Sequence, residues 1–196
     1  MIGQSLRRLE DERFLSGHSR YVADINLPRQ TWMQVVRSPH AHATIRRIAL
    51  DGARAVPGVL GVFTASDLAD LGPLPCIVPV ASVRPMISPL RFALTHDRVR
   101  HVGDPLAFVV AETRDAARTA AETVGVDYVT LPAITKTATA LNPGAPLVWD
   151  VAPDNISYQF QKGDAAAVKS ALATAAHVVE LEIGRASCRE RVLRLV

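Results

Sequence analysis

The sequence has 196 residues, of which 48% are hydrophobic and 21% charged, a composition typical of globular proteins that excludes a disordered chain. No apolar run approaches the roughly 20 residues of a membrane-spanning helix, and two cysteines, Cys76 and Cys188, exclude a disulfide framework. The net charge of +3 comes from residues 184–196, which hold four arginines and one glutamate, so no nucleic-acid-binding surface is expected.

The first half of the chain has the pattern of short strands separated by turns. We expect strands over residues 21–25, 31–37, 42–50 and 59–64, with short helices at 53–56, after Asp51, and at 66–68. The alternation of the third strand slips at Arg47-Ile48, which predicts a bulge. Residues 72–92 contain five prolines and are expected to form a long surface connection.

The pattern of residues 98–183 predicts a helix that packs closely on a buried strand. After a short strand over 98–102, the run Leu106–Ala111 is apolar on both faces, as in a central strand. Thr113 is expected to cap a helix whose inner face is small: Ala116, Ala117, Ala120, Ala121 and Val124. A strand at 126–129, a proline-rich connection at 142–146, a helix beginning at Gly163-Asp164 and a strand at 178–183 follow. The fold class is therefore α+β.

Candidate catalytic and metal-binding residues do not form a recognisable set. His40 and His42 share one face of an extended chain, but no third ligand accompanies them, so polar residues at a strand entrance are favoured over a metal pair. The remaining candidates are isolated or lack the neighbours that their chemistry requires: His96, His101, His177, Ser5, Ser16, Ser66, Ser88, Cys76 and the charged run Glu10, Asp11 and Glu12. We predict no catalytic, cofactor-binding or metal-binding residue in this chain.

Several short segments follow one another in a characteristic order between residues 3 and 183. They are Gly3–Ser5, Arg8–Asp11, Phe14–Gly17, Tyr21–Ile25, Val36–Ala43, Pro57–Val59, Val62–Leu68, Val102–Glu112, Val126–Tyr128 and Leu131–Ala133. In this order they resemble the start of the large, molybdopterin-binding subunit of the xanthine dehydrogenase, aldehyde oxidase and carbon monoxide dehydrogenase family. Ser19, Asp104 and Lys136 depart from the family's usual glycine, glutamate and acidic residue, so the resemblance names no substrate.

The resemblance implies an α/β-hammerhead domain over residues 12–135, with a mixed sheet and small-residue helices packed on it. Residues 145–183 would be the truncated start of the first molybdopterin-binding domain, a second α+β domain, and residues 184–196 a basic tail unrelated to the family. In the family, the complete subunit hydroxylates an aldehyde or an N-heterocycle, or oxidises carbon monoxide. It uses molybdenum on molybdopterin, here expected as the cytosine dinucleotide, with 2Fe-2S and FAD on partner subunits or domains.

Two interpretations of the function follow. The first is an amino-terminal structural portion of such a large subunit, inactive by itself because the family's cofactor-binding residues lie beyond residue 183, with the remainder of the subunit as its partner. The second is a free-standing, non-catalytic binding or assembly module of the same fold. Arg7-Arg8 is followed by charged rather than apolar residues, so we expect no export signal and a cytoplasmic location.

Overall fold

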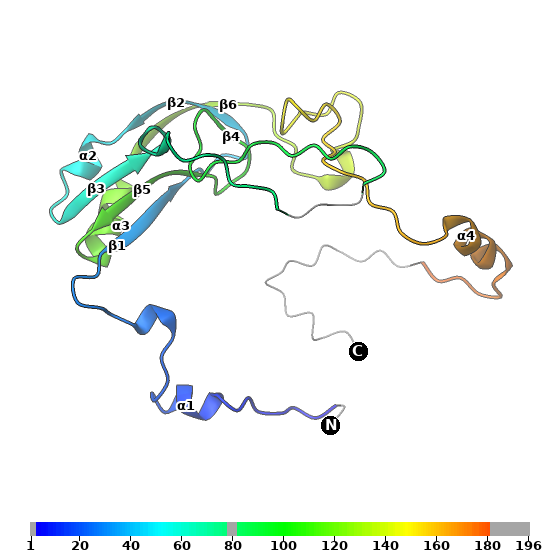
Figure 1. Ribbon diagram of the computed structural model, residues 1–196, viewed down its shortest axis with the longest axis horizontal. Coiled ribbons are helices and arrows are strands. Elements are labelled where there is room, and N and C mark those ends of the chain that lie inside the picture. Colours follow the sequence, from blue (N-terminus) through cyan, green and yellow to red (C-terminus); the bar gives the residue numbers. More distant parts are fainter. Residues whose placement is uncertain (1–2, 78–81, 181–196) are drawn as a thin grey trace. The chain divides into compact units, whose positions relative to one another are not determined.

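The computed structural model describes residues 3–77 and 82–180 (Figure 1). Its contacts divide the chain into two compact units, residues 1–159 and residues 160–196. The first unit holds two three-stranded sheets, and its described residues also form the short helix α1 (Asp11–Leu15).

The central strand of the first sheet is the most buried part of the fold. This sheet has the order β1 (Trp32–Arg37), β5 (Pro105–Ala111) and β3 (Val59–Thr64). The predicted central strand is confirmed as β5, since side chains on both of its faces are buried: Leu106, Ala107, Val109 and Ala111. A strand that is apolar on both faces needs covering on both sides, and the fold provides this cover.

The second sheet has the order β4 (Arg98–Val99), β2 (Ala43–Ala49) and β6 (Gly125–Thr130). The register of β2 against β6 shifts between Ile45 and Arg47, beside the predicted phase slip. Buried Ala43, Val99 and Leu106 form one core cluster, so Leu106 of β5 joins the two sheets.

The strand pairs are antiparallel throughout the described residues, which confirms the α+β class and corrects the expectation of a mixed sheet. A parallel pair requires a crossover that returns the chain to the same sheet. Here the helix that follows β5 leads instead to β6 of the other sheet.

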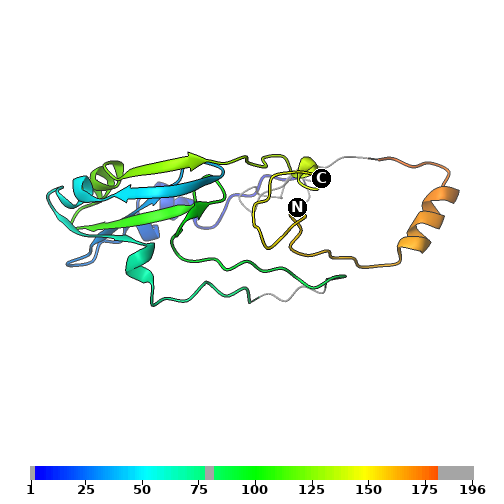
Figure 2. The same cartoon turned by 90° about the horizontal axis from the view of Figure 1, so that it is seen from above.

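The small-residue helix covers the face of the first sheet that is opposite Leu106. This helix, α3 (Arg114–Glu122), begins where the hydroxyl of Thr113 accepts a hydrogen bond from the amide of Ala116 at 3.1 Å, as predicted. Ala120 packs in a second core cluster with Ala53 of α2 (Asp51–Arg54) and with Val62 and Val109. Figures 1 and 2 show α2 and α3 at the same end of the strands.

Local side-chain hydrogen bonds explain where the predicted elements fail. Residues 21–25 form the 3-10 helix η1 (Val22–Asp24) instead of a strand, because the carboxylate of Asp24 accepts a hydrogen bond from the amide of Tyr21 at 2.9 Å. The helix expected at 53–56 begins two residues earlier, as α2, so Asp51 is its first helical residue instead of the residue that caps it. The helix expected at 66–68 is η2 (Ala65–Leu68), and η3 (Thr137–Thr139) was not predicted.

A segment that we call the strap, residues 140–159, completes the first unit. The side chain of Asn155 closes the strap on itself, accepting from the amide of Val148 at 2.9 Å and donating to the carbonyls of Ala140 and Pro146 at 3.0 Å each. Hydrogen bonds and an ion pair tie the strap to the end of the proline-rich connection, among them Val83 amide to Gln159 carbonyl, Ile87 amide to Ser157 carbonyl, and Arg84 to Asp154. The first unit therefore continues to Gln159.

The second unit contains α4 (Ala165–Thr174), which confirms the helix predicted to begin at Gly163-Asp164, and the carboxylate of Asp164 caps it by accepting a hydrogen bond from the amide of Ala167 at 2.9 Å. Its described residues are all exposed. The strand predicted at 178–183 is absent from residues 178–180, and the rest of that segment lies outside the described residues.

Candidate functional site

The two histidines of the candidate metal pair lie in the turn between β1 and β2. The ring of His42 donates through Nδ1 to the carbonyl oxygen of Pro132 at 2.7 Å, and its buried Nε2 has no hydrogen-bond partner among the described residues. The ring of His40 packs edge-on against Tyr128 at 4.5 Å between centroids. Within residues 3–77 and 82–180, no group of three or more His, Cys, Asp or Glu side chains is placed to hold a metal ion.

A buried serine joins this turn to the loop before β5. Ser38 is only 2% exposed, and its hydroxyl accepts a hydrogen bond from the amide of His40 at 3.0 Å. Its own amide donates to the carbonyl of Asp104 at 2.9 Å, and its carbonyl accepts from the amide of Gly103 at 2.8 Å. Burial raises the pKa of the neighbouring Tyr128, and the hydroxyl of Ser38 opposes that shift more weakly.

The carboxylate of Asp104 organises the turn from residue 100 to residue 103. One oxygen accepts hydrogen bonds from the amides of Arg100 and His101, at 2.6 and 3.2 Å, and the other lies 2.8 Å from Nδ1 of His101. Asp104 is 8% exposed, so these contacts satisfy a carboxylate that is largely removed from water. The residue therefore shapes the loop that precedes β5.

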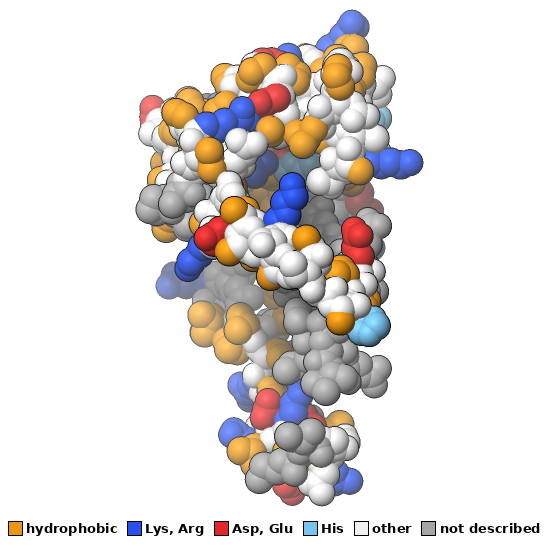
Figure 3. Space-filling view, turned by 90° about the vertical axis from the view of Figure 1, so that its right-hand side faces the viewer, with side chains coloured by type: hydrophobic (Ala, Val, Ile, Leu, Met, Phe, Trp, Pro, Cys, Tyr) orange, Lys and Arg blue, Asp and Glu red, His pale blue; other side chains and the backbone are white. Residues whose placement is uncertain are grey.

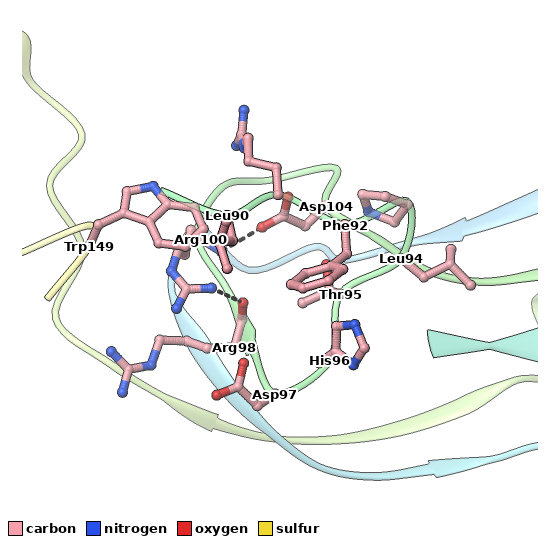
Figure 4. Close-up of a pocket in the computed structure, with 12 residues that line it drawn as sticks. Leu90, Phe92, Leu94, Thr95, His96, Asp97, Arg98, Arg100, Asp104 and Trp149 are labelled. Carbon is pink, nitrogen blue, oxygen red and sulfur yellow. Dashed lines mark hydrogen bonds between the residues drawn. The ribbon is translucent and has the colours of Figure 1, made fainter. Parts of the chain in front are cut away.

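Beside this turn lies a cavity of about 400 Å³, formed where residues 90–105 meet the strap. Figure 4 shows Trp149, from the strap, lying alongside Arg100 from the other segment. The carbon of the Arg100 guanidinium is 3.8 Å from the centre of the Trp149 ring, within cation–π range. The lining combines apolar and ionisable side chains: Leu90, Arg91, Phe92, Leu94, Thr95, His96, Asp97, Arg98, Arg100, Asp104, Pro105 and Trp149.

Two arginines of the cavity differ in whether a carboxylate neutralises them. Arg98 forms an ion pair with Asp150 at 3.0 Å, whereas Arg100 makes no ion pair with any described residue. Burial lowers the pKa of Arg100, and the carboxylate of Asp97 acts in the opposite direction. Because arginine stays charged at neutral pH, Arg100 is a half-buried cation without a direct counter-ion in the described part of the chain.

The other candidates from the sequence are dispersed. His96 lines the cavity and packs edge-on against Phe92, His101 contacts Asp104, and His177 is exposed in the second unit. Cys76 is an exposed free thiol, and Cys188 lies outside the described residues. Asp11, Glu12 and Ser16 line one surface pocket at α1, and the remaining candidates are exposed and dispersed: Ser5, Ser66, Ser88 and Glu10.

The contact between Arg100 and Trp149 was not predicted from the sequence. They are separated by strands, a helix and the start of the strap, and no local spacing indicates that they stack. The only available signal was that Trp149 is one of two tryptophans in a chain with few aromatic residues.

The surface that Figure 3 shows carries Lys and Arg side chains singly and interspersed with other types, without one continuous basic patch in view. Among the described helices, none combines the length and the hydrophobicity that crossing a bilayer requires.

Comparison with known proteins identifies the family. The sequence profile of the "Aldehyde oxidase and xanthine dehydrogenase, a/b hammerhead domain" matches residues 16–132, more than half of the chain. The chain belongs to this family. The hammerhead match covers the six strands of the described residues together with α2 and α3, which are the elements that build the two core clusters.

The relatives are large subunits of molybdenum hydroxylases. The chain is 35% identical over 156 residues to the carbon monoxide dehydrogenase large chain of Afipia carboxidovorans, covering 80% of this chain and 18% of that protein. It is also 35% identical over 182 residues to the nicotine 6-hydroxylase large subunit of Paenarthrobacter nicotinovorans, covering 91% of this chain and 21% of that protein.

A solved structure agrees with these relationships. Quinoline 2-oxidoreductase from Pseudomonas putida 86 aligns with a TM-score of 0.71 and 32% identity, over 90% of this chain and 22% of that chain. The chain therefore spans about a fifth of the length of the relatives that it matches.

Proposed function

We propose that this chain is the amino-terminal structural portion of the large subunit of a molybdenum hydroxylase. The observation that carries the proposal is the hammerhead match over residues 16–132, within a unit whose two core clusters are formed by its own strands and helices. In the proposed arrangement, the hammerhead occupies residues 12–135, and residues 145–183 begin the first molybdopterin-binding domain. The strap follows the hammerhead and overlaps the start of the second of these segments, and its contacts with residues 83–87 attach it to the first unit.

The whole protein would carry out oxidative hydroxylation of an aldehyde or an N-heterocycle, or oxidation of carbon monoxide. The identity of 35% is the same to a carbon monoxide dehydrogenase and to a nicotine 6-hydroxylase, so it favours no single substrate. The proposed cofactor of the whole protein is molybdenum on molybdopterin cytosine dinucleotide. Its proposed partners are 2Fe-2S and FAD subunits or domains, and its proposed location is the cytoplasm.

We propose that the residues that bind this cofactor in the whole protein lie beyond residue 183. The described residues contain no cluster of three or more His, Cys, Asp or Glu side chains placed to hold a metal ion, and the cavity beside Arg100 is lined by arginine, aspartate, histidine, threonine and apolar side chains. We also propose that the chain contributes folding and packing to the subunit and that it is inactive alone, with residues 184–196 as a tail unrelated to the family.

The test is to measure molybdenum content and turnover of the purified 196-residue chain. We expect no bound molybdenum and no oxidation of benzaldehyde, quinoline or carbon monoxide with an artificial electron acceptor. The complete carbon monoxide dehydrogenase of Afipia carboxidovorans is the positive control. Stoichiometric molybdenum or turnover by the chain alone would contradict the proposal.

A second measurement gives the proposal a positive readout. The remainder of the Afipia carboxidovorans large chain, without the part that corresponds to this protein, is co-expressed with residues 1–183. We expect the two polypeptides to co-purify in a 1:1 ratio. Failure to associate, with both polypeptides folded, would favour the free-standing module instead.

A further inference from the structure

We propose that the cavity between residues 90–105 and the strap is a binding site for a small organic carboxylate with an apolar body. The proposal concerns the side chains of the first unit alone and goes beyond the structural role proposed above. It rests on three features of the cavity: an arginine with unused donors, apolar side chains on part of the wall, and neighbouring charges that are either paired or exposed to solvent (Figure 4).

The guanidinium of Arg100 is held in place but makes few hydrogen bonds. Nη1 donates to the carbonyl of Arg98 at 2.9 Å, the ring of Trp149 covers one side, and the buried Nε has no partner among the described residues. Nη2 makes no hydrogen bond with the described part of the chain. A planar guanidinium with unused N–H groups is suited to a carboxylate, and stacking has already restricted its side-chain freedom.

The walls of the cavity select for an apolar body. Leu94 is buried at 4% exposure, and Phe92, with its ring packed against His96, and the ring of Trp149 supply aromatic surface. The volume of about 400 Å³ lies in the range of small-molecule sites, which combine mostly apolar walls with a few polar groups. An inorganic anion would leave these walls without contacts.

The remaining charges favour an anion over a cation. The carboxylate of Asp104 already binds two backbone amides and faces His101, and Asp150 is paired with Arg98. Asp97 is exposed, so solvent screens its charge. Arg91 also makes no ion pair with a described residue, but it is exposed like Asp97, so solvent screens its charge as well, and Arg100 is left as the half-buried group without an ion pair. The unpaired charge at the cavity is therefore positive.

Trp149 provides a direct readout of binding. In a Trp32→Phe variant of the full chain, Trp149 is the sole tryptophan, and its fluorescence reports on the cavity. Benzoate is titrated against this variant at pH 7, with benzamide as the neutral probe of the same shape and inorganic phosphate as the anion without an apolar body. We expect saturable quenching by benzoate and roughly tenfold weaker binding of both other probes.

Variants in the same background separate recognition from folding. Arg100→Met is expected to weaken benzoate binding by about tenfold or more, because it removes the charge-assisted hydrogen bonds. Arg118→Met is the matched control, since Arg118 is an exposed arginine of α3 away from the cavity, and it should leave binding unchanged. Phe92→Ala, at a partly exposed position, should weaken benzoate but leave the weak binding of acetate unchanged.

Urea unfolding of each variant establishes that it is folded before binding is compared. The proposal is overturned if benzoate gives no saturable change, if benzamide binds as tightly as benzoate, or if Arg100→Met binds like Arg118→Met. Equal binding of phosphate and benzoate would also overturn it, because the apolar walls would then contribute nothing.

Discussion

Asp104 links the loop before β5 to the cavity. Its carboxylate replaces the water that the amides of Arg100 and His101 would otherwise bind, and this fixes the direction in which Arg100 leaves the backbone. A buried acceptor shared by two donors is costly to remove, since both amides lose their partner at once. The position thus supports both the fold and the geometry of the proposed carboxylate site.

Replacing Asp104 by alanine should lower the free energy of unfolding by about 1–3 kcal/mol, because two amides lose their acceptor. The measurement is urea denaturation followed by circular dichroism. Asp97→Ala, at an exposed position just before β4, is the control and should change stability by less than about 0.5 kcal/mol. Equal effects of the two substitutions would show that the carboxylate of Asp104 does not hold the turn.

Asp67 should make stability depend on pH in the acid range. The amide and hydroxyl of Thr64 donate to its carboxylate at 2.7 and 2.9 Å, and these bonds lower the pKa of Asp67. The folded carboxylate binds protons less readily than the unfolded one, so its contribution is full above the ordinary pKa and is lost as pH falls through the lower, folded value.

The corresponding experiment compares Asp67→Asn with the unmodified chain by urea unfolding at pH 6 and at pH 2.5. We expect the variant to be less stable at pH 6 and the difference to shrink at pH 2.5. Asp70→Asn, an exposed position nearby, should give the same small difference at both values. A difference that does not change with pH would contradict this assignment.

At the scale of elements, α3 depends on the small size of its buried residues. Ala117 and Ala120 are 2% and 0% exposed, and Ala120 contacts the core that Val62 and Val109 build from the sheet. A helix can approach a sheet this closely only if its facing side chains are short. Larger residues at these positions must displace either the helix or the strands.

Ala120→Val should therefore destabilise the chain by about 1–3 kcal/mol through overpacking. Thr119→Val introduces the same residue at an exposed position of the same helix and should cost less than about 0.5 kcal/mol. Thermal unfolding by calorimetry compares the two. Similar melting temperatures would mean that the helix does not pack as tightly as described.

Local patterns predicted elements whose causes are local. The apolar run of β5, the Thr113 cap and the Asp164 cap each depend on neighbouring residues, and all three were predictable. The strand expected at 21–25 was wrong because a side-chain hydrogen bond of Asp24 competes with extended structure. The contact of Arg100 with Trp149 depends on how the strap returns to residues 83–100, and no periodicity in the sequence encodes that return.

At the scale of the whole molecule, the two units differ in how their apolar residues are covered. The first unit has two buried clusters, whereas the described residues of the second have none, and Val168 and Leu172 of α4 are 58% and 53% exposed. These two side chains lie four residues apart and share one face of the helix. Exposed apolar faces of this kind promote association.

We expect the full chain to self-associate with increasing concentration in sedimentation velocity and a chain ending at Gln159 to stay monomeric. Val168→Glu with Leu172→Glu should reduce the association of the full chain, whereas Lys169→Glu, which changes charge without removing an apolar side chain, should not. Association that is the same with and without residues 160–196 would place its cause in the first unit.

Every strand pair described above joins a strand that precedes residue 65 to one that follows residue 97. Neither half of the chain can therefore build a sheet from its own strands. During synthesis on the ribosome, β1, β2 and β3 therefore stay unpaired until β4 and β5 have been synthesised. The proline-rich connection is synthesised before β4 and β5, and its prolines disfavour its own pairing with the unpaired strands in their place.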